Sequence, residues 1–311
     1  MRWPRWLAGV VLACTAVLIA TPKARASNWI TKGGSLQRMS VETGAHGLIE
    51  LVPYWETPSV GESATQPVVI DRVIYHLAGD YLWRVTLDGA NRPIAEPERI
   101  RDVAKDDFIR FNRTPDGQFI APQSSPTYSP DTGVLYFGTG YGWLWAYHTI
   151  EGWARPAELS LGCPVVGSPL VIHDNGRDIV VVADRPNYPG EENRPEGRPL
   201  CPRSHGKVWV VQGLDQLNGS VHRQVYESVT NKQDVAGFGG FITPSAVMAP
   251  FHGEDPSFVI GTDGFQGGRA LRLALDRSSN YRPYRVWTVD STAGFAGNFT
   301  SDGTHAYWLD T

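Results

Sequence analysis

A unit of short strand-like runs recurs along this chain, and this repeat limits the possible folds more than any other feature. Its clearest copy spans residues 125–152, where three runs of four to six residues, rich in Val, Leu, Tyr, Phe and Trp, alternate with turns that contain Gly, Asp or Pro. Such runs are typical of antiparallel strands joined by hairpins. Because one small sheet cannot bury both of its faces, the copies must pack against one another.

Similar units begin at Gln66, Ser168 and Thr243, and the third run of every unit has an apolar residue at its centre. These central residues are Leu82, Leu144, Val208 and Leu271. Their spacings of 62, 64 and 63 residues exceed the period of about 40–50 residues that is common in repeats of this kind. The excess indicates inserted loops. Outer fourth strands are expected at residues 221–229 and 284–289.

Tryptophan follows the central residue in three of the four units, at Trp83, Trp145 and Trp209. One residue type at one place in a repeat is what packing between neighbouring sheets requires. A ring of tryptophans around a cofactor would give the same pattern, but we interpret these residues as packing residues.

The order of features within the unit resembles a known repeat. A Ser-Pro entry, a strand, a polar turn, a second strand ending in Gly and a Gly-x-Leu-x-Ala third strand resemble the repeat of the pyrroloquinoline-quinone-like β-propeller superfamily. The resemblance is carried most closely by Ser125–Pro126, Leu135–Gly138, Gly142–Ala146 and Gly152. It implies an all-β fold, a β-propeller of four-stranded blades arranged radially around a channel. It says little about the task, since this scaffold hosts many.

We expect a single propeller domain over residues 27–311, with four whole blades at about residues 66–95, 124–161, 167–229 and 242–290. Residues 293–311 read as the first two strands of a further blade, and residues 33–55 read as its third and fourth strands. A blade shared between the two termini would then make a five-bladed ring. The alternative is that the chain is part of a seven- or eight-bladed ring.

The amino terminus has the pattern of a targeting segment. Arg2 and Arg5 precede an apolar run over residues 7–20, and Ala24-Arg25-Ala26 forms a cleavage signal. The run is shorter than the ~20 residues that a membrane-spanning helix needs. We therefore expect a signal peptide over residues 1–26, no membrane span after its removal, and an extracytoplasmic location in the periplasm, at the cell surface or secreted. Lipoprotein processing at Cys14 and an uncleaved anchor remain alternatives.

The net charge and the cysteine content indicate which classes of partner and which cellular compartment suit this chain. Loss of the four cationic residues in residues 1–26 leaves 24 Lys and Arg against 32 Asp and Glu, so the formal charge falls from −4 to −8. An acidic chain without a basic stripe does not suit nucleic acid. Cys163 and Cys201 remain, and in an exported protein a disulfide between them is the expected state. Two separately buried thiols are the alternative.

Loops that exceed the repeat are the candidate contact regions, because long loops on a rigid scaffold commonly carry recognition. Three insertions stand out, at residues 96–123, 153–161 and 186–205, and two near copies occur at residues 236–243 and 293–300. The candidate contact residues within these segments are Phe108, Phe111, Phe238, Phe241, Phe295 and Asn298. Solvated loops, and glycines needed for close packing near the axis, are the alternative interpretation.

The sequence offers no set of residues for catalysis. The superfamily that this chain resembles includes quinone-dependent alcohol dehydrogenases, which use adjacent cysteines and a calcium site of Glu, Asn and Asp. In this chain Cys163 and Cys201 are far apart in the sequence. There is no Gly-x-Ser-x-Gly or His-Glu-x-x-His motif, and the eight histidines show no metal-binding spacing. No catalytic or metal residue is therefore nominated, and no cofactor is expected.

These observations favour an exported, non-catalytic propeller that acts as a binding or assembly scaffold for a protein or an envelope polymer. In this it is similar to quinone-free members of the superfamily, such as the β-barrel assembly lipoprotein scaffold. The alternative is a quinone- or metal-dependent oxidoreductase that holds pyrroloquinoline quinone with calcium.

Overall fold

The computed structural model of the chain describes residues 65–103, 107–108, 124–159, 163–165, 167–184, 201, 206–227, 245–262, 268–291, 300–301 and 304–307. Within these ranges the chain is all-β, apart from one 3-10 turn (η2, Arg277–Ser279). No helix in the described ranges is long and apolar enough to cross a membrane. The expected signal peptide and residues 33–55 lie outside the described residues.

Four antiparallel sheets of four strands form the body of the protein, and consecutive strands pair within each. The first sheet contains β1 (Val68–Ile70), β2 (Val73–Ala78), β3 (Tyr81–Thr86) and β4 (Glu98–Arg99). The second contains β7 (Thr127–Ser129), β8 (Val134–Gly138), β9 (Trp143–His148) and β10 (Ala154–Glu158). The third contains β11 (Leu170–Asp174), β12 (Arg177–Ala183), β13 (Lys207–Gln212) and β14 (His222–Glu227). The fourth contains β15 (Val247–His252), β16 (Asp255–Thr262), β17 (Gly268–Asp276) and β18 (Arg282–Ser291).

Two smaller sheets complete the described structure. One pairs β5 (Arg101–Asp102) with β6 (Asp107–Phe108), and the other pairs β19 (Thr300–Ser301) with β20 (Ala306–Tyr307). The all-β fold built of four-stranded antiparallel units is thus confirmed. The exact blade boundaries and the blade shared between the termini stay predictions.

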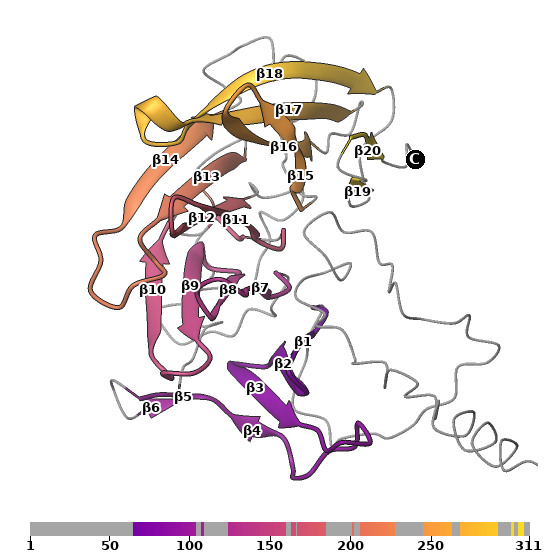
Figure 1. Cartoon of the computed structure of the whole chain (residues 1–311), viewed down its shortest axis with the longest axis vertical. Helices are drawn as coiled ribbons and strands as arrows, with labels where there is room; N and C mark the ends of the chain where they lie inside the picture. The colour runs from indigo at the N-terminus through magenta and orange to yellow at the C-terminus, as the bar shows by residue number, and fades with distance from the viewer. Residues whose placement is uncertain are drawn as a thin grey trace, which may run out of the picture.

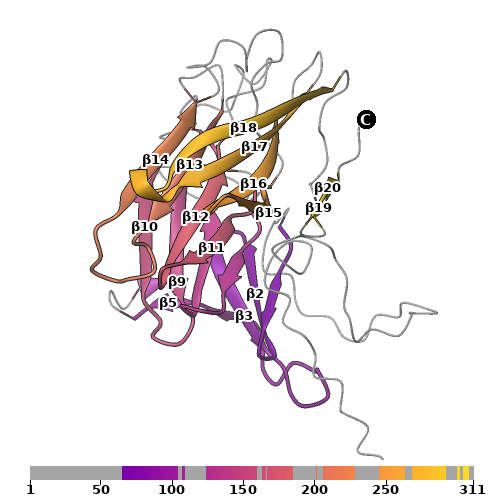
Figure 2. The same ribbon diagram turned by 45° about the horizontal axis from the view of Figure 1, so that its top comes forward.

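The four sheets follow one another around an arc (Figure 1). Their first strands β1, β7, β11 and β15 lie towards the inner side, and their fourth strands β4, β10, β14 and β18 lie on the outside. Contacts agree with this arrangement, because β7 touches β11 along the inner side and β14 touches β18 along the outer side. Figure 2 shows the third sheet between the second and the fourth. Radially packed four-stranded sheets are the arrangement of propeller blades.

The apolar core is divided into layers between neighbouring sheets. Leu82 faces the second sheet, Leu144 faces the third and Val208 faces the fourth, and each of the three is fully buried. Burial of each such side chain stabilises the fold by roughly 1.5–3 kcal/mol. Trp145 and Trp209 are partly buried on the opposite faces, against the preceding sheet. The interpretation of these two tryptophans as packing residues between sheets is confirmed.

The fourth sheet corrects one expected correspondence. Leu271 packs with the third sheet, whereas its neighbour Ala270 lies on the other face. Ala270 therefore corresponds to Val208, as the match of Gly268-Arg269-Ala270 to Gly206-Lys207-Val208 also indicates. Because side chains alternate between the faces of a strand, a register error of one residue places the side chain on the wrong face.

Two segments expected as inserted loops contain outer strands instead. The segment 96–123 holds β4, the outer strand of the first sheet, and residues 153–161 hold β10, the outer strand of the second. Both residues of β4 are exposed, and β10 is short and contains Pro156 and Arg155. Strands at the outer edge of a blade bury little apolar surface, so the alternation that predicts strands is weak there.

The expected disulfide between Cys163 and Cys201 is present, with the two Cα atoms 4.5 Å apart. It closes a sequence separation of 38 residues, for which the chain-entropy account gives a stabilisation of about 3–4 kcal/mol. Both residues are buried. The disulfide joins the segment that leads into the third sheet, which contains Cys163, with the segment before β13, which contains Cys201.

Candidate functional site

A buried carboxylate lies between the second and third sheets. Asp178 of β12 has a fully buried side chain. Its carboxylate accepts hydrogen bonds from Ser129 Oγ at 3.0 Å, Tyr136 OH at 2.8 Å and Thr132 Oγ1, all from the second sheet or its hairpin. His173 Nδ1 of β11 lies 2.9 Å from the same carboxylate. Four side chains therefore converge on one acceptor at the interface between two sheets.

This cluster contains the residue types of a hydrolytic triad, but its geometry is different. The hydroxyl of Ser129 donates to Asp178, not to His173, whereas a nucleophile must be hydrogen-bonded to the base that activates it. Each hydroxyl donates to the carboxylate, so its oxygen is not activated for attack. What the cluster does chemically is to stabilise a buried charge and join two sheets.

The electrostatics of the cluster agree with this role. Burial, followed by the charge of Asp178, raises the pKa of Tyr136 well above its usual range, so its phenol stays protonated and can donate. The hydrogen bond to Asp178 raises the pKa of His173, and the nearby carboxylates of Asp131 and Asp215 act in the same direction. Burial also raises the pKa of Asp215. Protonation of His173 therefore offsets negative charge at this interface.

A second polar link joins the third and fourth sheets. The guanidinium of Arg277, in η2, donates from Nε at 2.8 Å and from Nη2 at 2.9 Å to the carboxylate of Asp174 at the end of β11. Tyr281 OH donates to the same carboxylate at 2.7 Å. A partly exposed pair contributes little to stability, but its two parallel bonds fix the orientation of the groups.

Hydroxyl groups at the starts of the inner strands link all three interfaces. Ser125 Oγ accepts from the backbone N–H of Gln66 at 2.9 Å, and Ser245 Oγ accepts from that of Ser168 at 2.8 Å. Between them, Thr127 Oγ1 donates to Pro169 O at 2.7 Å. Ser125 lies in a Ser-Pro pair, whereas Thr127 and Ser245 each follow a proline. The polar residues around these prolines therefore have a physical role that the repeat alone did not reveal.

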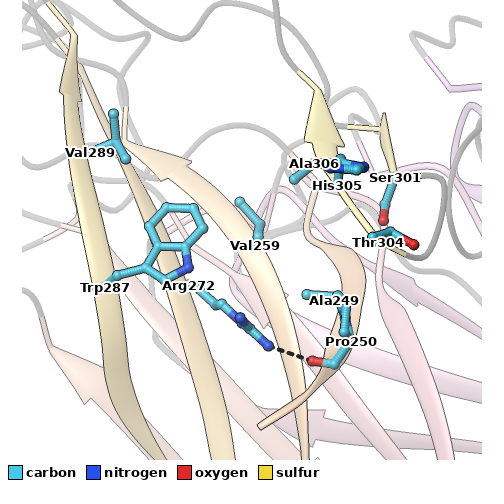
Figure 3. A pocket seen from close by; sticks show the side chains of 10 residues that line it. All are labelled: Ala249, Pro250, Val259, Arg272, Trp287, Val289, Ser301, Thr304, His305 and Ala306. Atoms are coloured by element: carbon cyan, nitrogen blue, oxygen red, sulfur yellow. Dashed lines mark hydrogen bonds between the residues drawn. The ribbon is translucent and has the colours of Figure 1, made fainter.

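A groove lies between the fourth sheet and the β19–β20 pair, with a cavity of about 300 Å³. Figure 3 shows Trp287, Val289, Arg272 and Val259 of the sheet on one side and Ser301, His305 and Ala306 on the other. The remaining lining residues are Ala249, Pro250 and Thr304. Arg272 donates from Nη2 to Pro250 O at 2.6 Å, which holds its guanidinium along one wall (Figure 3).

The chemistry of this groove does not fit calcium with a quinone. Such a site needs carboxylate and amide oxygens, and none of the ten residues that line the groove is Asp, Glu or Asn. Across the described part of the chain, no three His, Cys, Asp or Glu side chains gather as a metal-binding group. The groove presents an indole and aliphatic side chains, together with one guanidinium, one imidazole and the hydroxyls of Ser301 and Thr304. Its apolar part suits packing against another apolar surface.

Most of the predicted contact residues cannot be placed. Phe108 lies in β6, where its backbone pairs with Arg101. The other five, Phe111, Phe238, Phe241, Phe295 and Asn298, lie outside the described residues. The roles of all six stay predictions. The buried cluster around Asp178 and the groove beside Trp287 were not predicted from the sequence.

No protein family model and no curated protein matches this chain. Among solved structures, the chain is similar to a europium-containing methanol dehydrogenase, at 10% identity and a TM-score of 0.35, over 92% of this chain and 62% of the other. It is also similar to a chain of the mitotic checkpoint complex, at 11% identity and a TM-score of 0.31, over 81% of this chain and 77% of the other. The chain thus spans less than two thirds of the length of the dehydrogenase. The fold assignment rests on the sheets described above, and these similarities carry no argument about activity.

Proposed function

We propose that this protein is an exported, non-catalytic β-propeller that serves as a binding or assembly scaffold in the cell envelope or outside the cell. The proposal is based on one observation: the buried carboxylate of Asp178 forms hydrogen bonds across the interface between two sheets. Its hydrogen-bonding capacity is directed at Ser129, Thr132 and Tyr136 of the adjacent sheet. A charged group used in this way holds sheets in a fixed arrangement and is not presented to a substrate.

The disulfide between Cys163 and Cys201 supports an extracytoplasmic location, because disulfides persist mainly in oxidising compartments. It also fixes Cys201, in the long segment between β12 and β13, to the segment that leads into the third sheet. An insertion attached to a rigid sheet is a common place for recognition.

Recognition of a protein or an envelope polymer is assigned to the inserted loops. Phe108 and Phe111 lie in one insertion, and Phe238, Phe241 and Phe295 lie before inner strands. Aromatic side chains supply much of the binding energy at protein interfaces. These residues are therefore the first to replace in a search for lost binding.

The most informative experiment separates the scaffold from the oxidoreductase. Purified protein is incubated with pyrroloquinoline quinone and Ca²⁺, and quinone absorbance, calcium content, and alcohol- or sugar-dependent dye reduction are then measured. The proposal predicts no stoichiometric uptake and no dye reduction. Stoichiometric uptake accompanied by substrate-dependent dye reduction would overturn it and establish a quinone-dependent oxidoreductase.

The contact loops are tested separately. A photoreactive p-benzoylphenylalanine is placed at Phe111 or Phe238, and a matched control is placed at Val225, an exposed residue on the outer strand β14. Irradiation in the native envelope fraction should attach the same partner at both loop positions and not at the control. Equal products at all three positions would show that these loops have no special role.

A further inference from the structure

The groove beside Trp287 occupies a place that is filled at the other sheet interfaces. Between the second and third sheets, Trp209 of β13 packs on a cluster that includes Leu144 of β9 and Ala157 of β10. Between the third and fourth sheets, the cluster includes Leu271 of β17 and Tyr226 of β14. At both interfaces, the third and fourth strands of one sheet thus face the third strand of its neighbour.

The outward face of the fourth sheet has only part of this cover. Val259, Ala270 and Trp287 form a cluster there, and Ala306 of β20 packs against it. The strands β19 and β20 have the place in the chain of the first and second strands of a fifth sheet. Val289 of β18 is 43% exposed. Within the described residues, therefore, Ala306 covers only part of this face, and the groove extends across it from Ala249 and Pro250 of β15 to Trp287 and Val289 of β18.

The first sheet carries the matching face at the other end of the arc (Figure 1). Trp83 has the position of Trp145 and Trp209, but it is only partly buried and lies outside the buried clusters of the described residues. Tyr81 meets it edge to face, and the guanidinium of Arg99 lies 5.1 Å from the Tyr81 ring. The outward face of the first sheet and the outward face of the fourth sheet lie at the two ends of the arc. Both carry the kinds of residue that, at the other interfaces, pack between neighbouring sheets.

We propose that residues 33–55 of this chain seat in the groove as the third and fourth strands of a fifth sheet, paired to β20 and packed on Trp287. The inference is independent of the proposed function. The run from Leu48 to Val52 is apolar on both faces except at Glu50, as suits a strand that lies between two sheets. Gly44 and Gly47 provide the turn between the two strands.

Chain length supports this occupant. From residue 55 to the start of β1 at residue 68 there are 13 positions. From the end of β10 at residue 158 to the start of β11 at residue 170 there are 12. An outer strand ending at residue 55 would therefore reach the next inner strand through a connection of the length used between the second and third sheets.

Photocrosslinking of the full chain tests directly whether residues 33–55 bind in the groove. p-Benzoylphenylalanine replaces Val289, which lines the groove, and the matched control replaces Val225, which is 38% exposed on β14. Mass spectrometry should find crosslinks from position 289 to residues 33–55 of the same chain, and none to that segment from position 225. The yield should be unchanged on about tenfold dilution, because the reaction is intramolecular.

Three results would overturn the proposal. These are crosslinks between light and heavy chains in an isotope-mixed sample, crosslinks from position 289 only to other segments, and no crosslink at all. The first would identify a second copy as the occupant. A further variant, Leu51→Asp, keeps the chain full length and should lower the yield several-fold, because a carboxylate would be buried between two sheets. The control Glu50→Gln should keep the original yield.

Discussion

Tyr136 of β8 donates a 2.8 Å hydrogen bond to Oδ2 of Asp178 in β12, although the two residues are 42 positions apart and belong to different sheets. The bond is buried, and its acceptor is a carboxylate that also accepts hydrogen bonds from Ser129 and Thr132. Hydrogen bonds to charged groups contribute more than neutral ones, about 1.5–3 kcal/mol each. The contact therefore fixes how the second and third sheets face each other.

Removal of one hydroxyl from the inner side of the sheets should weaken the fold. Thr127→Val keeps the shape of the side chain but removes the donor to Pro169 O. The buried carbonyl then loses this hydrogen bond, and we expect the free energy of unfolding to fall by about 1–2 kcal/mol. Urea denaturation measures the change. Thr86→Val, at the exposed end of β3, is the matched control, and equal effects of the two substitutions would contradict the assignment.

The His173–Asp178 contact should make stability depend on pH with a definite sign. The hydrogen bond to Asp178 raises the pKa of His173 above its usual 6.5. A base with a raised pKa stabilises the folded state fully below its unfolded pKa, and this contribution is lost as the pH rises through the folded pKa. The destabilisation caused by His173→Gln should therefore be larger at about pH 5 than at about pH 9.

Urea denaturation over a pH series measures this dependence. His76 serves as a control of opposite sign, because burial lowers its pKa. Its contribution is complete above the unfolded pKa and is lost as the pH falls through the folded pKa. The His173 ring is partly exposed, so solvent screens the effect and it should be small. A destabilisation by His173→Gln that does not change with pH would show that the charge of the histidine is not involved.

Alanine substitutions at two glycines should destabilise the fold for different reasons, steric overlap at Gly138 and backbone strain at Gly176. A Cβ at Gly138 would overlap the side chain of Val165, whereas a Cβ at Gly176 meets nothing within 4 Å. Gly176 has a φ of +72°, which disfavours other residues. Gly138→Ala should destabilise by about 1–3 kcal/mol through overpacking, and Gly176→Ala by about 1 kcal/mol through strain.

Replacement of Val165 by glycine distinguishes the two causes. In the Val165→Gly background, the effect of Gly138→Ala should shrink, because the Cγ1 and Cβ atoms of Val165 that the added methyl group would overlap are absent, and the effect of Gly176→Ala should stay the same. Thermal denaturation of the original protein, the three single variants and the two double variants measures this. No reduction at Gly138 would mean that the overlap with Val165 is not what makes this position sensitive.

The inner and central strands could be predicted from the sequence because they bury apolar side chains in a regular pattern. Leu82, Leu144 and Val208 are such residues, and the disulfide was predicted from two cysteines in a chain that we expected to be exported. The outer strands β4 and β10 could not, since β4 is exposed throughout and a strand with little buried surface has no clear alternation. Leu271 was assigned to the wrong face by a shift of one residue.

The buried cluster could not be predicted for a different reason. Asp178 lies close to a hairpin turn, where aspartate is common without any long-range role. Its partners Ser129 and Tyr136 are 49 and 42 positions away. Only the packing of two sheets brings them together, and no local pattern records that contact. An aspartate directly before the β-branched run Ile179–Val182 was the one available signal.

The central claim is that successive sheets are joined face to face through buried contacts, and a double-mutant cycle across the second and third sheets tests it most directly. Tyr136→Phe, Asp178→Ala and the double variant are compared with the original protein by urea denaturation. Contact across the interface predicts a coupling energy of about 1–2 kcal/mol, whereas residues without contact give additive effects within about 0.5 kcal/mol. Additive effects would contradict the arrangement of sheets described here.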